Sequence, residues 1–178
     1  HGDEDGAQMV IDHIWHMLEE TAGLPKRTGS VNYGQLLPDH GLMPEAVYLL
    51  NSLSRSRTYD VFELFSEVVN RLAENPRDWM DLRCGIYCYC ESVAYVASGR
   101  KDTGMLPLLR RLLAFSEFQQ EAENPLLSER FIMLKSALLS AMHQLGDPQG
   151  TKGLKALQHH PKRIIAQAAN MLLDEKPV

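Results

Sequence analysis

The 178-residue sequence is poor in cysteine and has no excess of positive charge, and each shortage excludes a class of protein. Its three cysteines, Cys84, Cys88 and Cys90, crowd into one short stretch and suit no disulfide framework of a small secreted domain. We therefore expect a reducing compartment and a cytoplasmic location. The formal net charge of -5 gives no electrostatic reason to expect DNA or RNA as a partner.

Long hydrophobic runs are missing as well. No apolar stretch approaches the ~20 residues of a membrane-spanning helix, so no part of the chain is expected to cross a bilayer. The sequence begins with His1 and a polar segment rather than a signal peptide. This start predicts that the chain is processed or is a fragment of a longer protein.

The short motifs of common catalytic sites are absent too. The sequence contains no G-x-x-x-x-G-K-[ST], G-x-G-x-x-G, H-E-x-x-H or G-x-S-x-G pattern. These absences remove the usual signatures of nucleotide binding, zinc proteolysis and serine hydrolysis. We expect neither a cofactor nor a metal, and we favour a binding role over catalysis.

Apolar residues recur at helical spacing through nearly the whole chain, and no stretch shows the sustained alternation of half-buried strands. The pattern predicts an all-α fold of about eight helices. Their expected ranges are 6–22, 44–54, 59–74, 78–98, 105–121, 125–145, 149–158 and 161–174. The segment 23–42 is interrupted by several glycines and prolines. We therefore expect residues 1–42 to be a helix plus a long loop that acts as a linker or cap, and 43–178 to be the main helical domain.

A constant spacing relates three of the expected helices. Phe62, Leu108 and Leu154 follow one another at intervals of 46 residues, and each begins a similar apolar pattern after a polar turn. A period of this length suits paired helices of the HEAT or armadillo class, which bury a continuous core only when they stack. The alternative is an irregular bundle in which the spacing is a coincidence.

One segment carries a family resemblance. Residues 145–148, followed by Leu154 and Leu157 and then by the run from Ile165 to Leu173, resemble a HEAT repeat of the phycobilin-lyase-type bacterial proteins. The resemblance is clearest over 138–174, weaker over 91–113 and 47–72, and does not cover 1–42. It implies an α-solenoid of antiparallel helix pairs with a scaffolding or partner-binding role, and it transfers no catalytic residue.

Two basic clusters are candidate binding sites. If the repeats stack, the clusters could line one surface and attract an acidic partner or a phosphate. The alternative is ordinary surface charge at turns and helix ends. The clusters comprise Arg100, Lys101, Arg110 and Arg111, and then Lys152, Lys155, Lys162 and Arg163 with His159 and His160 beside them.

The loop 24–41 is where we expect a site that carries none of the known motifs, because polar groups on a long loop against a rigid helical framework often carry function. Its alternative is a linker that only crosses the surface. Tyr33 and His40 are the candidate binding residues there, together with Lys26, Arg27, Gln35 and Asp39.

Two groups have partial metal-ligand spacing. Cys84 and Cys88 share a helix face, but no fourth ligand is evident nearby, so packing between helices is favoured. His13, His16 and Glu20 share a strip of the first helix without the second-helix partner that completes a bundle site. A solvated polar face is favoured there.

These observations predict a non-catalytic helical repeat module that binds a protein partner or docks on another domain of its own parent chain. A nucleic-acid binder using the clusters at 100–111 and 152–163 is one alternative. An accessory domain of an enzyme, with a site at the 24–41 loop, is the other.

Overall fold

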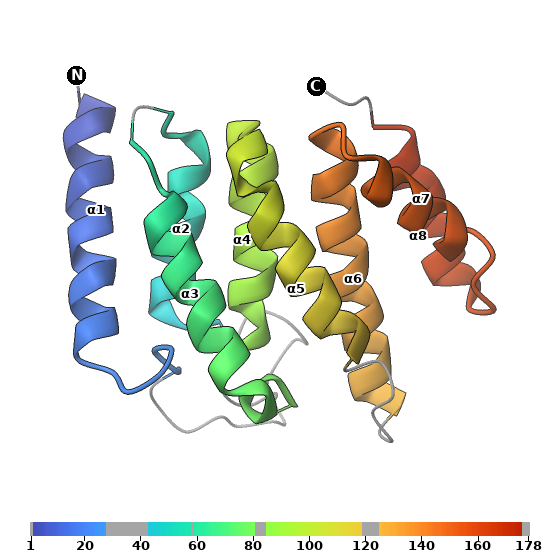
Figure 1. Ribbon diagram of the computed structural model, residues 1–178, viewed down its shortest axis with the longest axis horizontal. Coiled ribbons are helices and arrows are strands. Elements are labelled where there is room, and N and C mark those ends of the chain that lie inside the picture. Colours follow the sequence, from blue (N-terminus) through green and yellow to red (C-terminus); the bar gives the residue numbers. More distant parts are fainter. Residues whose placement is uncertain (1, 28–42, 58, 81–84, 119–124, 176–178) are drawn as a thin grey trace, which may run out of the picture. The chain divides into compact units, whose positions relative to one another are not determined.

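The computed structural model describes residues 2–27, 43–57, 59–80, 85–118 and 125–175, and those residues form eight α-helices and no strand (Figure 1). The all-α prediction is therefore confirmed for the described part of the chain. No helix within it is both long enough and apolar enough to cross a membrane. The helices are α1 (Gly2–Glu19), α2 (Glu45–Ser52), α3 (Phe62–Glu74), α4 (Tyr87–Arg100), α5 (Leu106–Phe118), α6 (Pro125–Gln144), α7 (Pro148–Leu157) and α8 (Arg163–Leu173), with 3-10 turns at Leu53–Arg55, Pro76–Met80 and Thr103–Met105.

The chain divides into two compact units, His1–Ser92 and Val93–Val178, and the division falls inside α4. The boundary expected at residue 42 lies within the first unit, at the end of a segment, 28–42, outside the described residues.

In the first unit, α1 packs against α2 (Figure 1). The buried side of α1 carries Ile11, Ile14 and Leu18, which recur at the three- and four-residue spacing of one helix face. Val47 and Leu50 are the matching buried residues of α2. Burial of these faces against each other, more than helix propensity, is what stabilises such short helices.

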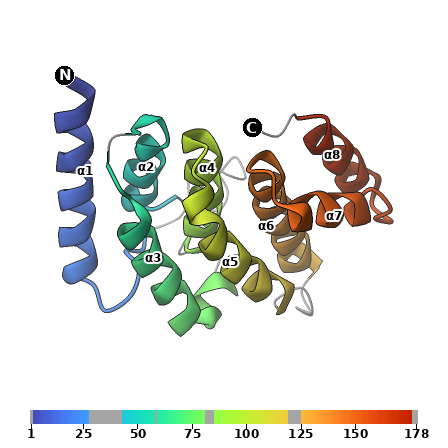
Figure 2. The same cartoon turned by 45° about the horizontal axis from the view of Figure 1, so that its top comes forward.

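In the second unit, α6 packs against α5, α7 and α8 (Figure 2). Two glycines allow α7 to approach α6 closely. A Cβ atom on Gly150 would lie 2.4 Å from the backbone nitrogen of His143, and one on Gly153 would lie 2.4 Å from a methyl carbon of Leu139. The absence of a side chain at both positions therefore sets the distance between these two helices.

The prediction of a single helix over 78–98 is wrong in its first part. Residues Pro76–Met80 form a 3-10 turn, and α4 begins only at Tyr87. Gly85 has φ 64, a left-handed conformation that a right-handed helix cannot contain. The indole Nε1 of Trp79 instead donates to the carbonyl of Leu72 at 3.0 Å, which holds the turn against the end of α3.

The same backbone turn closes α4 and α6. Lys101 has φ 57 and Gly146 has φ 77, and each residue lies 45 positions from the other. The next amide in each turn donates back into its helix, from Asp102 to the carbonyl of Ala97 at 3.0 Å and from Asp147 to that of Met142 at 2.9 Å. This is the left-handed helix ending of the Schellman type, and it occurs twice with one offset.

An aspartate follows each turn and starts the next helical segment. The carboxylate of Asp102 accepts the Gly104 amide at 2.9 Å, and that of Asp147 accepts the Gln149 amide at 2.8 Å. In the first unit, Asp60 accepts the Phe62 amide at 2.8 Å in the same way. Aspartate is suited to this role because its short side chain reaches the unpaired amides of a helix start.

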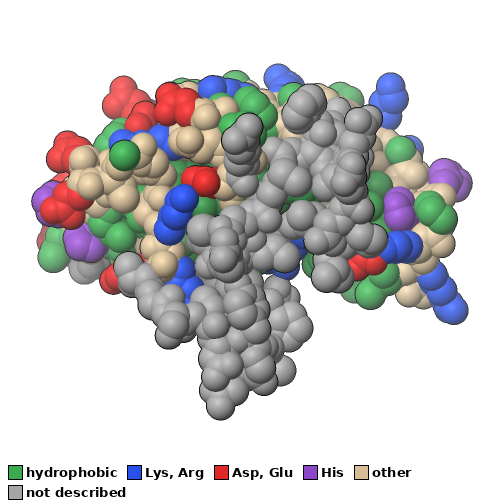
Figure 3. Space-filling view, turned by 90° about the horizontal axis from the view of Figure 1, so that it is seen from below, with side chains coloured by type: hydrophobic (Ala, Val, Ile, Leu, Met, Phe, Trp, Pro, Cys, Tyr) green, Lys and Arg blue, Asp and Glu red, His purple; other side chains and the backbone are tan. Residues whose placement is uncertain are grey.

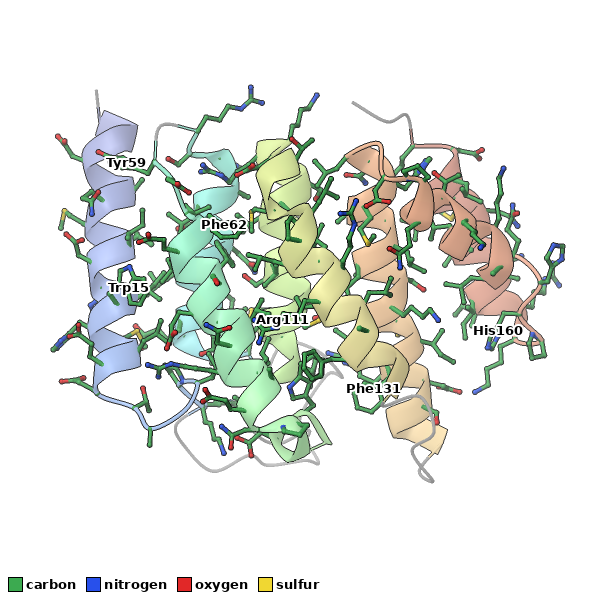
Figure 4. All side chains as sticks on the ribbon, in the orientation of Figure 1. Trp15, Tyr59, Phe62, Arg111, Phe131 and His160 are labelled. Carbon is green, nitrogen blue, oxygen red and sulfur yellow. The ribbon has the colours of Figure 1, made fainter. Side chains whose placement is uncertain are left out.

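The core register corrects the expected equivalence of Phe62 with Leu108 and Leu154. Phe62 is 36% exposed in the first turn of α3 (Figure 4), whereas Leu108 and Leu154 are buried. Leu109 and Leu154 are both fully buried, and each follows its left-handed turn, at Lys101 or Gly146, by eight residues. Their spacing is therefore 45 rather than the expected 46, and in α3 the fully buried phenylalanine is Phe65.

Candidate functional site

A cavity of about 610 Å³ lies in the first unit, between the end of α1, the segment after it and the start of α2. Its apolar lining comes from Met17, Pro25, Met43 and Tyr48. The polar lining residues are Glu20, Thr21, Lys26, Arg27 and Glu45.

Arg71 of α3 holds one wall of this cavity. Its Nη1 donates to the carbonyl oxygens of Leu18, Thr21 and Gly23 at 2.7, 2.9 and 2.6 Å. Its Nε donates to Glu67 at 2.6 Å, so the guanidinium is also charge-compensated. These carbonyls lie at the end of α1, where a helix leaves acceptors unpaired.

Tyr89 of α4 holds the next part of the wall. Its buried hydroxyl donates to the carbonyl of Pro25 at 2.6 Å. Burial, and secondarily the neighbouring Cys88 thiol, raises the pKa of this hydroxyl well above its usual range, so the group remains a donor. The segment that precedes the cavity is thus fixed from two helices.

The charges in the cavity are not equivalent. Lys26 lies 3.0 Å from Asp78 and is compensated by it. Arg27 differs, because its Nη1 is buried and has no hydrogen-bond partner among the described residues. A buried guanidinium nitrogen without an acceptor is unfavourable, and a carboxylate entering from outside would relieve that cost.

The residues expected to form a site on the loop 24–41 are only partly described. Tyr33, Gln35, Asp39 and His40 lie outside the described residues. Arg27 and Met43, the described residues on either side of 28–42, both line the cavity. The cavity thus includes two candidate residues of the expected loop, Lys26 and Arg27, together with Met17 and Tyr48 of the neighbouring helices, which the sequence did not single out.

The basic cluster of 100–111 is largely compensated within the second unit. The side chain of Arg100 is only 6% exposed and lies 3.9 Å from Asp102. Arg110 contacts Asp147 at 2.7 Å. Lys101 is exposed in its turn, and Arg111 is exposed on α5 (Figure 4).

The basic cluster of 152–163 is more open. Lys162 pairs with Glu129 across two exposed side chains. Lys152, Lys155 and Arg163 are exposed, and His160 lies in the turn between α7 and α8 (Figure 4). The second cluster therefore keeps three exposed basic side chains outside that ion pair, whereas the first is largely compensated.

Neither candidate metal group gathers three ligands among the described residues. Cys84 is outside them, and Cys88 and Cys90 are buried free cysteines. Burial, and secondarily Glu91, raises the pKa of the Cys90 thiol, which keeps it protonated. His16 lies 3.2 Å from Glu20 with both side chains mostly exposed, as a solvated face requires.

Two exposed apolar surfaces were not expected from the sequence. Ile164 and Met171 of α8 are 76% and 73% exposed, although the spacing of Ile164 predicted an inward position. Ile165 and Ala169 are the residues that face the core. On α1, Met9 is 73% exposed and lines a shallow hollow with Val10, Asp12, His13 and Leu49. Met9 falls outside the buried stripe of α1, which is the only sequence signal it offers.

No protein-family model, curated protein or solved structure matches this chain significantly.

Proposed function

We propose that the helices form stacked pairs of the HEAT-like kind, as an α-solenoid. The support is the recurrence of one turn at Lys101 and Gly146, with the same donor pattern and the same capping aspartate 45 residues apart. A fixed offset in both turn and core register is typical of repeat proteins, in which each unit repeats the contacts of its neighbour.

The role that this arrangement supports best is a non-catalytic module that binds a protein partner, or another domain of a longer parent chain, in the cavity beside Arg27. The observation that carries the proposal is the buried Nη1 of Arg27, which has no hydrogen-bond partner among the described residues, in a cavity of mixed apolar and polar lining. A short segment that presents an acidic residue next to an apolar one would pair with Arg27 and cover Met17 and Met43.

Selection of peptides from a random display library on the immobilised protein tests this role. We expect enriched sequences in which Asp or Glu stands beside Leu, Met or an aromatic residue. Their affinity should fall about tenfold or more with Arg27→Gln, as for loss of a desolvated charge-assisted contact. The exposed Arg163→Gln is the matched control and should bind normally. An absence of enrichment, or peptides whose affinity ignores Arg27, would contradict the proposal.

The same cavity favours a second candidate, an accessory domain of an enzyme with its site beside the 24–41 segment. Small organic acids would then stabilise the protein in a thermal-shift screen, whereas peptides would not. The reverse preference is expected for the partner-binding module.

A further inference from the structure

The two exposed apolar surfaces described above lie on α1 and α8, and they involve none of the residues that line the Arg27 cavity. We propose that they are complementary, so that the α8 surface of one copy of this chain docks on the α1 surface of a second copy. This inference goes beyond the proposed function and does not depend on it.

The α8 surface is an apolar stripe within a basic surround. Ile164, Ala168 and Met171 are all exposed and recur at i, i+4 and i+7, the spacing of one helix face. The stretch 148–173 contains no Asp or Glu, and its charged residues are all basic, namely Lys152, Lys155, Lys162 and Arg163. Lys162 pairs with Glu129, and the exposed Asp174 and Glu175 follow the stretch, so basic residues remain in excess around the stripe.

The α1 surface has the opposite charge. The helix contains no lysine or arginine, and Asp5, Asp12 and Glu19 are exposed on it. Met9 borders an open hollow of about 550 Å³, with Val10 and Leu49 as its other apolar members. In Figure 3, acidic side chains gather where α1 and α2 lie, and Lys and Arg side chains extend where α7 and α8 lie.

Charge and shape together select this pairing over contact between like surfaces. Two α8 surfaces would bring together four basic residues from each copy, and two α1 surfaces would bring acids together, whereas the unlike pair attracts. The protruding Ile164 or Met171 would enter the hollow beside Met9 and remove apolar surface from water on both copies. Because the two surfaces differ, the contact is heterologous. One copy keeps a free α1 surface and the other a free α8 surface, and each can bind a further copy.

Sedimentation velocity on two variants tests the proposal. Met9→Gln removes the apolar residue of the α1 surface, and Ile164→Gln with Met171→Gln removes the stripe of α8. Each variant alone should be monomeric. Their equimolar mixture should form a 1:1 dimer, because one variant keeps an intact α8 surface and the other an intact α1 surface. Met133→Gln, at an exposed methionine of α6 outside both surfaces, is the control and should self-associate like the unaltered protein.

Self-association by either surface variant alone would overturn the proposal, since it would mean that like surfaces pair. A monomeric mixture would overturn it equally, and would leave these surfaces to a partner other than this chain. A second measurement needs no substitution. Association of the unaltered protein should weaken about tenfold or more between 50 mM and 500 mM salt, because screening removes the attraction between acidic and basic surfaces. A protein that stays monomeric at 50 mM salt and at a concentration of about 100 μM contradicts the proposal.

Discussion

Asp147 binds Arg110 with one carboxylate oxygen and the start of α7 with the other. Its Oδ2 lies 2.7 Å from Nη2 of Arg110, and its Oδ1 accepts the amide of Gln149 at 2.8 Å. The aspartate side chain is only 3% exposed, whereas that of Arg110 is 52% exposed. A single buried carboxylate thus joins α5, the turn after α6 and the first turn of α7.

Substitution of Asp147 should cost more stability than substitution of Asp102, which follows the same type of turn 45 residues earlier. Both residues accept a helix-start amide, a role whose loss costs about 1 kcal/mol. Asp147 also compensates Arg110, although solvent screens that partly exposed partner. We expect Asp102→Ala to lower the free energy of unfolding by about 1 kcal/mol and Asp147→Ala by about 2 kcal/mol. Urea unfolding measures both, and equal losses would show that Arg110 adds nothing.

A methyl group at Gly150 should be far more disruptive than one at Gly6. The Cβ at Gly150 would lie 2.4 to 2.8 Å from backbone atoms of α6, which cannot move aside as a side chain can. Gly6 lies within α1 with nothing within 4 Å of its Cβ position. We expect Gly150→Ala to cost about 3 kcal/mol through overpacking, and Gly6→Ala to stabilise by up to about 1 kcal/mol through helix propensity. A tolerated Gly150→Ala, measured by thermal unfolding, would contradict the close approach of α7 to α6.

Loss of Arg71 should loosen the end of α1. Arg71→Ala removes the side-chain donor of the Thr21 and Gly23 carbonyls and leaves the Leu18 carbonyl with only the Thr21 amide, at an expected cost of about 2 kcal/mol. Arg71→Lys keeps the charge but cannot supply the planar fork, so it should restore only part of the loss. Hydrogen exchange of residues 16–24 reports the effect locally. The exposed Arg55→Ala serves as the control, and unchanged exchange in Arg71→Ala would refute the clamp.

Alkaline pH should destabilise the protein through Cys90. Burial raises the pKa of this thiol in the folded state, so the folded chain keeps a proton that the unfolded chain releases. The associated stability is complete below the unfolded pKa of about 8.5 and is lost as the pH rises above it. The expected slope is about 1.4 kcal/mol per pH unit for this group. Urea unfolding from pH 7 to pH 10 should show the decline, and Cys90→Ala should reduce it. An identical slope in both proteins would exclude Cys90 as the source.

Helical periodicity predicted most of the helices, because a buried face imposes its spacing on the sequence. The expected ranges 125–145 and 149–158 match α6 and α7 within about one residue, and Gly146 marks the turn between them. Periodicity missed the break in the helix expected over 78–98. The break lies at Gly85, whose positive φ cannot be read from a glycine within an apolar pattern. Periodicity also cannot show that Phe62 and Ile164 are exposed, because each lies next to a buried apolar residue, Val61 or Ile165, and spacing alone cannot choose between the neighbours.

The sequence pointed to the segment beside the cavity but could not predict the cavity itself. Glycines and prolines marked the segment that contains Lys26 and Arg27 as a long loop. The cavity depends on tertiary contacts. The most important are the hydrogen bonds of Arg71 and Tyr89 to backbone carbonyls about 50 and 64 residues away in the chain. Charge pairing such as Arg110 with Asp147 depends equally on packing, so counting basic residues overstated the free charge of the 100–111 cluster.

The register of α3, with Phe65 inward and Phe62 at the surface, is tested most directly by the free energies of unfolding of Phe65→Ala and Phe62→Ala. Both substitutions remove a phenyl ring from α3, but Phe65 is fully buried and Phe62 is 36% exposed. We predict a loss of about 3 to 5 kcal/mol for Phe65→Ala and of about 1 kcal/mol or less for Phe62→Ala. Equal losses, or a larger loss at Phe62, would contradict the register.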